Sequence, residues 1–289
     1  MEESDRVMSA PRNLVKQLVP ERLRLLRYSL YEKARYFPEL VFNLGNRLEC
    51  PFCGWHFRRF LPAGFQYPVI IEKQVIGGHW HRDNVCPRCK SNARERLAYL
   101  YLRDHTSLFH QPARVLHVAP EPQLAAVLKR LPNIRYFSAD LMGPGVMSHF
   151  DIQQMPFADE TFDVVICNHV MEHVNDDSVA MAAINRILKP GGWALLQVPI
   201  ALKLDRTIED PSAVTESQRI ERFGQEDHVR LYTRRDYVRR LKAAGFSVRV
   251  ESYPTVLGPA KVERFGLVQE EEVFLCSKVS PHSASEIES

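Results

Sequence analysis

The sequence of 289 residues contains no run of about 18 apolar residues, the length that a membrane-spanning helix needs, so no membrane span is expected. Its first residues, MEESDRVMSAPRN, lack the apolar stretch of a secretory signal, which makes a cytoplasmic, reducing location the expectation. The chain also has little excess charge of either sign, because it contains 38 Lys and Arg and 35 Asp and Glu. The hydrophobic share of 45% and the charged share of 25% exclude a largely disordered chain, a collagen-like fibre and a coiled coil.

The small excess of positive charge lies in the first part of the chain. Residues 1–111 hold 18 Lys and Arg against 11 Asp and Glu, whereas residues 112–289 hold 20 against 24. A basic surface can attract phosphates or acidic lipids, but an excess of this size is equally typical of an ordinary solvated surface. Charge alone therefore does not indicate a nucleic-acid-binding protein.

Four of the six cysteines form two Cys-x-x-Cys pairs, Cys50/Cys53 and Cys86/Cys89, with 32 residues between the pairs. Two such pairs can supply the four tetrahedral thiolate ligands of a structural zinc ion, and a redox dithiol or free thiols are the alternatives. A site with four cysteine ligands has no open coordination position, so we expect this zinc to hold structure rather than to catalyse. Cys167 and Cys276 fall in predicted strands, and we expect both to be buried.

From Arg114 onward, short apolar strands alternate with helical stretches. Strands are predicted at 115–119, 135–139, 162–168, 193–198, 246–251 and 272–277, and helices at 92–104, 123–131, 176–188 and 237–244. The helix at 176–188 is expected to stop at Pro190-Gly191-Gly192. Alternation of this kind implies an α/β fold with a mostly parallel sheet and helices on both faces. Its ligand crevice should lie beyond the carboxyl ends of the strands, where the strand order reverses.

The chain accordingly divides into four predicted parts. They are an N-terminal helical segment at 1–47, a zinc-ribbon-like module with a linker helix at 48–111, an α/β domain at 112–279 and a disordered tail at 280–289. The leucines and arginines of the first part fit a helix that packs on the protein, and a helix on a membrane surface is the alternative.

An ordered set of motifs in the α/β domain carries the functional signal. The strand 115–118 leads into the turn Ala119-Pro120-Glu121-Pro122, and Asp140 ends the next strand. The segments MPFADETFDVVICNHVMEHV and ILKPGGWALLQVP follow. This set resembles the class I S-adenosylmethionine-dependent methyltransferases, in particular their type-11 branch, densely over residues 114–200. The order of zinc ribbon and methyltransferase is also similar to one group of ribosomal RNA methyltransferases, whose metal-ligand pattern differs.

The resemblance implies a Rossmann-like sheet of seven strands that binds S-adenosylmethionine along its C-terminal edge. By motif position, Asp140 would hold the ribose hydroxyls, and Asp151 and Ile152 would contact the adenine. Asn168 and His169, at the end of the fourth strand, would lie near the methionine part and the methyl group. The domain at 112–279 is then the methyltransferase domain.

One turn departs from the family pattern. Where the family usually has an acidic residue and a glycine-rich turn, this chain has His117 and then Ala119-Pro120-Glu121-Pro122. Glycine lets the backbone approach a cofactor closely, and two prolines remove N–H donors. We expect Ala119 and Glu121 to line the cofactor site, with Glu121 paired with the amino group of the cofactor. A turn that no longer binds the cofactor is the alternative.

Two histidines are candidates for catalysis. Methyl transfer from a sulfonium needs an aligned nucleophile and in some cases a base. His228, next to Asp227 in the segment after the fifth strand, is predicted to be a general base with a pKa near 6.5, about the ordinary histidine value. His169 is the second candidate, and either histidine can instead be a hydrogen-bonded structural residue. Glu172 and His173 are expected to fix the helix that follows them.

Three functions are consistent with these features. The first is methyl transfer to a small-molecule or sugar-like acceptor. The second is methylation of RNA held by the basic zinc module. The third is an adaptor that binds S-adenosylmethionine without turnover. The sequence leaves the acceptor and the oligomeric state open.

Overall fold

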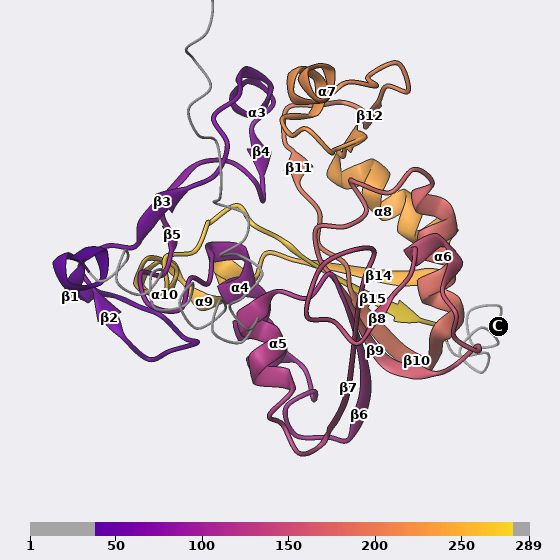
Figure 1. Cartoon of the computed structure of the whole chain (residues 1–289), viewed down its shortest axis with the longest axis horizontal. Helices are drawn as coiled ribbons and strands as arrows, with labels where there is room; N and C mark the ends of the chain where they lie inside the picture. The colour runs from indigo at the N-terminus through magenta and orange to yellow at the C-terminus, as the bar shows by residue number, and fades with distance from the viewer. Residues whose placement is uncertain (1–37, 280–289) are drawn as a thin grey trace, which may run out of the picture. The chain divides into compact units, whose positions relative to one another are not determined.

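A computed structural model describes residues 38–279 of the chain (Figure 1). The chain divides into two compact units, Met1–Leu44 and Gly45–Ser289. The helices predicted before residue 38 and the tail predicted at 280–289 lie outside the described residues. Within residues 38–279, no helix has the length and apolar character that crossing a bilayer requires.

The centre of the second unit is a seven-stranded sheet with the order β14-β15-β10-β9-β6-β7-β8 (Figure 1). Its strands are β6 (Ala113–Val118), β7 (Ile134–Asp140), β8 (Ser148–His149), β9 (Phe162–Cys167), β10 (Leu188–Leu195), β14 (Phe246–Glu251) and β15 (Val273–Lys278). Only β15 runs antiparallel to its neighbours, β10 and β14, so the predicted Rossmann-like fold is confirmed. The strand order reverses at β6, which pairs in parallel with β7 on one side and β9 on the other. The ligand crevice of such a sheet lies beyond the carboxyl ends of β6 and β9.

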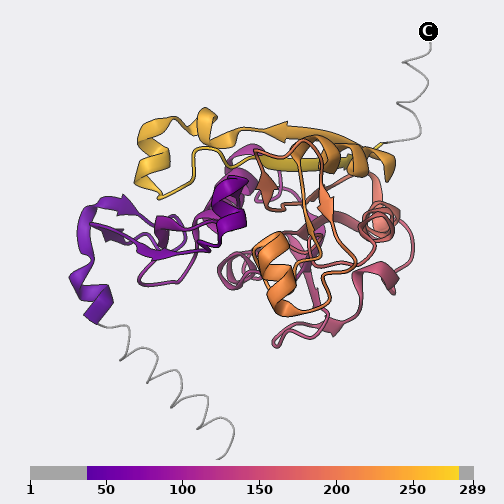
Figure 2. The ribbon, with the colours of Figure 1, turned by 90° about the horizontal axis from the view of Figure 1, so that it is seen from above.

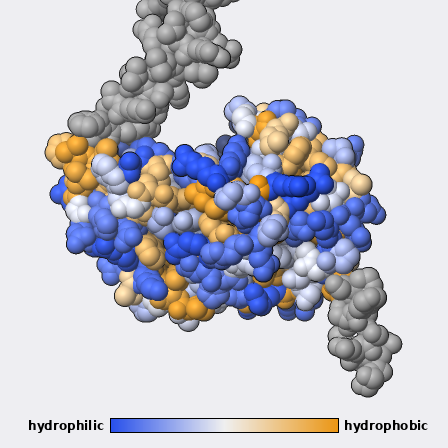
Figure 3. All heavy atoms as spheres, turned by 90° about the horizontal axis from the view of Figure 1, so that it is seen from below, coloured by the Kyte–Doolittle hydropathy of each residue, from blue (hydrophilic) through white to orange (hydrophobic). Residues whose placement is uncertain are grey.

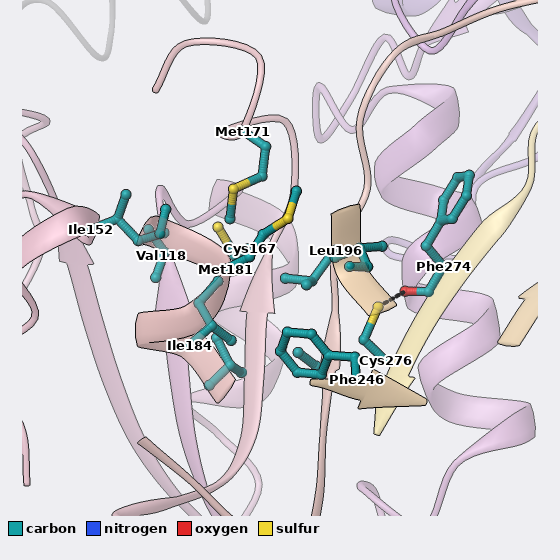
Figure 4. Close-up of a cluster of buried hydrophobic side chains, with 14 of the residues drawn as sticks. Val118, Ile152, Cys167, Met171, Met181, Ile184, Leu196, Phe246, Phe274 and Cys276 are labelled. Atoms are coloured by element: carbon teal, nitrogen blue, oxygen red, sulfur yellow. Dashed lines mark hydrogen bonds between the residues drawn. The ribbon is translucent and has the colours of Figure 1, made fainter. Parts of the chain in front are cut away.

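Helices cover both faces of the sheet, because its central strands bury side chains on both sides. Val165 and Cys167 of β9 join a core under α6 (Asp177–Ile187) and α8 (Arg234–Ala243). Val164 and Ile166 join a second core under α4 (Ala93–His105) and α5 (Pro122–Leu128). Figure 4 shows part of the first core, in which Cys167 and Cys276 are fully buried, as predicted.

Local signals explain where the helices begin. Asn92, Asp176 and Thr233 precede α4, α6 and α8, and each side chain accepts a hydrogen bond from a backbone N–H in the first turn of its helix. The helix α6 ends at Ile187, within one residue of the prediction, but β10 begins at Leu188 rather than at 193 and continues through Gly191 and Gly192 with a shift in its register. A Cβ atom at Gly192 would lie 2.9 Å from the carbonyl oxygen of Asp163. The two glycines therefore allow a bulged strand rather than a break.

The cysteine pairs belong to a small module at the start of the unit. Its elements are β1 (Leu44–Glu49), β2 (His56–Phe57), β3 (Leu61–Ala63), α3 (Pro68–Glu72), β4 (Val75–Ile76) and β5 (His81–Val85).

Arg96 of α4 is fully buried and joins this module to the C-terminal part of the chain. Its guanidinium donates to the carbonyl oxygens of Asn84 and Ser91 at 2.8 and 2.7 Å, and to those of Phe265 and Gly266, both at 2.7 Å. Figure 2 shows the gold C-terminal segment with α9 (Tyr253–Leu257) and α10 (Pro259–Arg264) extending to the indigo module.

Segments distant in sequence form a third, smaller core beyond the sheet edge. β4 of the module pairs with β11 (Ile200–Ala201), which follows β10. Ile70 of α3 packs there with Phe223 of α7 (Glu216–Phe223). Two short strands, β12 (Ile208–Glu209) and β13 (Arg230–Leu231), the 3-10 turn Ile152–Gln154 and a helical stretch at 38–42 are the other elements of the described residues. On the face drawn in Figure 3, hydrophobic residues are scattered among hydrophilic ones.

Candidate functional site

The two residues that follow the central strands have unusual backbone conformations. Ala119, directly after β6, has a φ of 46°, and His169, two residues after β9, has a φ of 56°. Residues other than glycine rarely adopt positive φ, and such strain tends to collect at functional sites. The N–H of Ala119 donates to the carbonyl oxygen of Ala139 at 2.8 Å. Ala119 thus adopts the left-handed conformation that glycine adopts most readily.

A half-buried carboxylate lies between the ends of β6 and β9. Glu121 Oε2 is 2.7 Å from Nε2 of the fully buried His117, whose Nδ1 is 3.1 Å from the hydroxyl of Tyr136. Asn168 Nδ2 donates to Glu121 Oε1 at 3.0 Å. Burial would raise the pKa of Glu121, but the hydrogen bonds from His117 and Asn168 outweigh it and lower that pKa. The strand residue is thus His117, and the carboxylate beside it belongs to Glu121 of the turn.

The remaining predicted cofactor residues lie along the same edge of the sheet. Asp140 ends β7, and its Oδ1 accepts from the N–H groups of Met142 and Gly143 at 2.9 and 2.6 Å. Within residues 38–279, Oδ2 of Asp140 has no such hydrogen bond. Asp151 accepts from the backbone and side chain of Gln153. Ile152 is buried in the core near Val118 (Figure 4).

The predicted catalytic histidines lie in one cluster with Glu172 and His173. His169 Nδ1 is 3.4 Å from Glu172 Oε1. The rings of His173 and His228 meet edge to face with their centroids 4.7 Å apart. His173 Nδ1 is also 3.1 Å from a carboxylate oxygen of Asp227. Glu172 and His173 were expected to fix the next helix, α6, whose N-terminal cap is Asp176.

Burial changes the protonation expected for this cluster. It lowers the pKa of His228 to about 4 and lowers that of His169 as well. Burial would raise the pKa of Glu172, but His169, His173 and His228 outweigh it and lower that pKa to about 2. At neutral pH, Glu172 is therefore ionised while His169 and His228 are neutral. A titration of His228 near 6.5, the expectation for an exposed histidine, does not fit its buried position.

A cavity of about 230 Å³ is lined in part by Gly77, which lies against His169, and is called the side cavity below. Its lining includes Gly77, His79, His81, Arg94, Gln225 and Glu271. A Cβ atom at Gly77 would lie 3.3 Å from both His169 Cε1 and Glu271 Oε1, so the missing side chain leaves the histidine ring next to the cavity wall. Arg94 donates to the carbonyl oxygen of Gly77 at 2.7 Å. Burial raises the pKa of Glu271 to about 7.

The four module cysteines lie together at two matching turns. Their sulfur atoms are all within 4.8 Å of one another, with Cys50 and Cys89 at 3.4 Å and Cys53 and Cys86 at 3.8 Å. In each turn the N–H of the fourth residue after the first cysteine donates to that cysteine's carbonyl oxygen: Gly54 to Cys50, and Lys90 to Cys86. Zinc–sulfur bonds of about 2.3 Å in a tetrahedron place sulfur atoms about 3.8 Å apart, close to these distances. A disulfide needs about 2.05 Å.

The doubly wound sheet, with carboxylates at the ends of β6 and β7, defines the class I S-adenosylmethionine-dependent methyltransferases. Residues 92–251, just over half of the chain, match the family described as methyltransferase domain, and the chain belongs to this family. The protein is thus a methyltransferase that uses S-adenosylmethionine.

Curated relatives match over short segments. The ubiquinone/menaquinone biosynthesis C-methyltransferase UbiE of Teredinibacter turnerae is 46% identical over 46 residues, which are 16% of this chain and 18% of that protein. The UbiE of Saccharophagus degradans is 29% identical over 87 residues, 29% of this chain and 35% of that protein. The chain therefore spans well under half the length of these relatives. A solved structure of a putative methyltransferase from Bacillus halodurans is 19% identical, covers 64% of this chain and 99% of its own, and has a TM-score of 0.41.

Proposed function

We propose that the protein transfers the methyl group of S-adenosylmethionine to a small molecule bound in the side cavity. The observation that carries the proposal is the position of that cavity, because its wall residue Gly77 lies against His169, just after β9. Its size suits a compact acceptor, because pockets for drug-sized ligands start at about 300 Å³. The polar lining residues His81, Arg94 and Glu271 suit an acceptor with several polar groups, such as a sugar-like compound.

The cofactor would lie across the carboxyl ends of β6, β7 and β9. Glu121 would hold its amino group, because this ionised carboxylate lies between β6 and β9. Asp140 would hold the ribose hydroxyls with its second oxygen, while Asp151 and Ile152 would lie at the adenine. Ala119 would bring the backbone close to the cofactor. Asn168 and His169 would lie near the methionine part and the methyl group of the cofactor.

The acceptor atom must lose a proton when it takes the methyl group, unless it is already ionised. We propose His169 as the base because its ring lies against Gly77 of the side-cavity wall and its imidazole is neutral at neutral pH. His228, the other predicted base, lies beside Glu172 and His173. We propose that it acts through this cluster rather than on the acceptor directly.

We also propose that Cys50, Cys53, Cys86 and Cys89 bind one structural zinc ion. Arg96 supports the assignment, since burial lowers its pKa to about 10 while the nearby thiols Cys50, Cys86 and Cys89 act to raise it. None of the ion pairs found among residues 38–279 pairs Arg96 with a carboxylate. Zinc with four thiolates carries a net charge of −2 and would compensate this buried cation.

RNA is the second candidate acceptor, and one observation favours it. Arg47, Arg58, Arg59 and Arg82 of the module surround an open hollow of about 500 Å³. Such a cluster can bind phosphates, although Asp83 already pairs with Arg47 at 2.6 Å.

Transfer of labelled methyl groups distinguishes the candidates. The purified protein is incubated with S-adenosylmethionine labelled in its methyl group, together with a cell extract separated into small molecules, RNA and proteins. We expect the label in the small-molecule fraction, and we expect it to disappear with the His169→Ala variant. Label in RNA that falls when Arg58 and Arg82 are both changed to alanine would favour RNA instead. Cofactor binding without transfer to any fraction would favour the adaptor.

A further inference from the structure

We propose that Glu172, His173 and His228 bind one divalent transition-metal cation, at a site separate from the four cysteines. Each of the three residues presents a ligand atom, and these atoms all lie within 4.8 Å of one another. The residues come from two distant segments, since Glu172 and His173 follow β9 whereas His228 lies two residues before β13. A hydrogen bond of 2.9 Å from the N–H of Val229 to the carbonyl oxygen of Glu172 holds the two segments together.

The second observation is that polar atoms of this cluster are buried without partners. Glu172 and His228 are each only 2% exposed. Yet, among the residues that the structure describes, Glu172 Oε2 and His228 Nδ1 have no hydrogen-bond partner, and neither does Nδ1 of the neighbouring His169. Each buried polar atom without a partner lowers the stability of the fold by about 1–3 kcal/mol. A carboxylate oxygen and imidazole nitrogens that lie together without partners therefore indicate a ligand. A cation bound by these lone pairs would remove the cost.

The types of the three ligands limit the identity of the cation. Two imidazoles and one carboxylate suit Zn²⁺, Fe²⁺, Co²⁺ or Mn²⁺, whereas Mg²⁺ and Ca²⁺ prefer oxygen ligands alone. A carboxylate oxygen of Asp227 lies 3.1 Å from His173 Nδ1. It would orient that ring, as outer carboxylates do around metal-bound histidines. Three protein ligands leave at least one coordination position open, unlike the closed set of four cysteines.

We expect the open coordination position to serve the reaction rather than folding, because His169 contacts both Glu172 of this cluster and Gly77 of the side-cavity wall. His169 Nδ1 is 3.4 Å from Glu172 Oε1, and its Cε1 borders Gly77 of the cavity wall. An oxygen atom of the acceptor could therefore bind the cation. This last role rests on the proposed function, but the cation site itself does not.

Manganese(II) is the probe that separates this site from the cysteines, because Mn²⁺ favours nitrogen and oxygen ligands over thiolates. The full-length protein is first loaded with zinc at the cysteines and freed of excess metal. Mn²⁺ is then titrated, and the loss of its free-ion electron paramagnetic resonance signal gives stoichiometry and affinity. We expect one Mn²⁺ per chain, with nitrogen couplings from two imidazoles.

Two variants and one control make the test specific. His173→Ala should weaken Mn²⁺ binding by at least about 100-fold, since loss of an outer-shell partner alone costs about 10- to 100-fold. His173 is one-third exposed, so the variant should fold, and His228→Gln provides a second ligand loss. The control is His149→Ala, at an exposed position of β8, which should bind Mn²⁺ normally.

Two results would overturn the cation site. One is a folded wild-type protein that binds neither Mn²⁺ nor any zinc beyond that of the cysteines. The other is Mn²⁺ binding that is unchanged in both ligand variants. Binding of S-adenosylmethionine is measured on the same samples, so that failure of the cation site with intact cofactor binding leaves the proposed function standing.

Discussion

His117 Nε2 lies 2.7 Å from Glu121 Oε2, and this contact joins the end of β6 to the turn that follows it. The strand position of the usual acidic residue is thus occupied by a buried imidazole, and the carboxylate comes from four residues further along the chain. Because Asn168 holds the other carboxylate oxygen, the group is fixed between the two central strands. The turn without glycine therefore still presents a carboxylate between the ends of β6 and β9.

Ala119→Gly tests the strain in this turn. A left-handed conformation costs about 1–2 kcal/mol in a residue with a Cβ atom, and glycine removes this cost. The greater freedom of glycine in the unfolded chain lowers the stability gained by about 0.5–1 kcal/mol. We expect the free energy of unfolding, measured with urea, to rise by about 0.5–1 kcal/mol. The matched control is Ala182→Gly, at an exposed position inside α6, which should lose about 1 kcal/mol. A similar loss in both variants would mean that Ala119 is not strained.

Two substitutions of Asp140 separate cofactor binding from loop structure. Asp140→Ala should weaken S-adenosylmethionine binding by about 1.5–3 kcal/mol, the range for hydrogen bonds to a charged group. Asp140→Asn keeps an acceptor for the N–H groups of Met142 and Gly143 but replaces the second oxygen with a donor. We expect it to lose most of the same affinity in calorimetric titrations. Normal affinity in the Asn variant would assign Asp140 to the loop alone.

Glu95 predicts a specific dependence of stability on pH. This buried side chain of α4 accepts from the N–H groups of Gln123 and Leu124 in α5, and burial raises its pKa from 4.5 to about 7. Since the folded state holds the proton more tightly than the unfolded state, stability falls as the pH rises from 4.5 to 7 and stays lower above that range. The full effect is about 3 kcal/mol, at 1.36 kcal/mol per pKa unit.

Glu95→Gln keeps the acceptor and removes the titration. We therefore expect the variant to unfold at nearly the same urea concentration as the wild type at pH 5, and at a clearly higher one at pH 8. Glu160→Gln, at an exposed position, should leave both midpoints unchanged. Equal pH dependence in wild type and Glu95→Gln would show that Glu95 is ionised in the folded protein.

Cys86→Ser tests the structural zinc. Loss of one thiolate from four should abolish tight zinc binding and should destabilise the module, since structural zinc contributes directly to folding. Cys276→Ser, in the core of the sheet, is the control that should keep one zinc in the module. Elemental analysis of freshly purified, reduced protein measures the metal. A wild-type protein without zinc, or a Cys86→Ser variant with the normal amount in the module, would refute the site.

Patterns within a short stretch of sequence predicted the fold well. The strand at 246–251 has the predicted bounds, and α8 lies close to the helix predicted at 237–244. The spacing of the cysteines also predicted that all four sulfur atoms would meet. These features depend on neighbouring residues, or on a motif that repeats.

Contacts between distant segments could not be predicted in the same way. The pairing of β4 with β11 joins residues more than a hundred positions apart, and nothing in either two-residue strand specifies its partner. For the same reason, the sequence did not predict that His228 would lie beside Glu172 and His173. The contact between His117 and Glu121 had a local signal, four residues of separation across a turn, but it also needs Asn168 from another strand.

The most direct test of the account is whether Glu121 holds the amino-acid part of the cofactor. Calorimetric titration compares S-adenosylhomocysteine with 5′-methylthioadenosine, which lacks that part, in the wild type and in Glu121→Gln. We predict that the wild type prefers S-adenosylhomocysteine and that the substitution weakens its binding by about 10- to 100-fold while methylthioadenosine binds as before. An unchanged preference in a folded Glu121→Gln variant would contradict the account, as would a wild-type protein that binds neither compound.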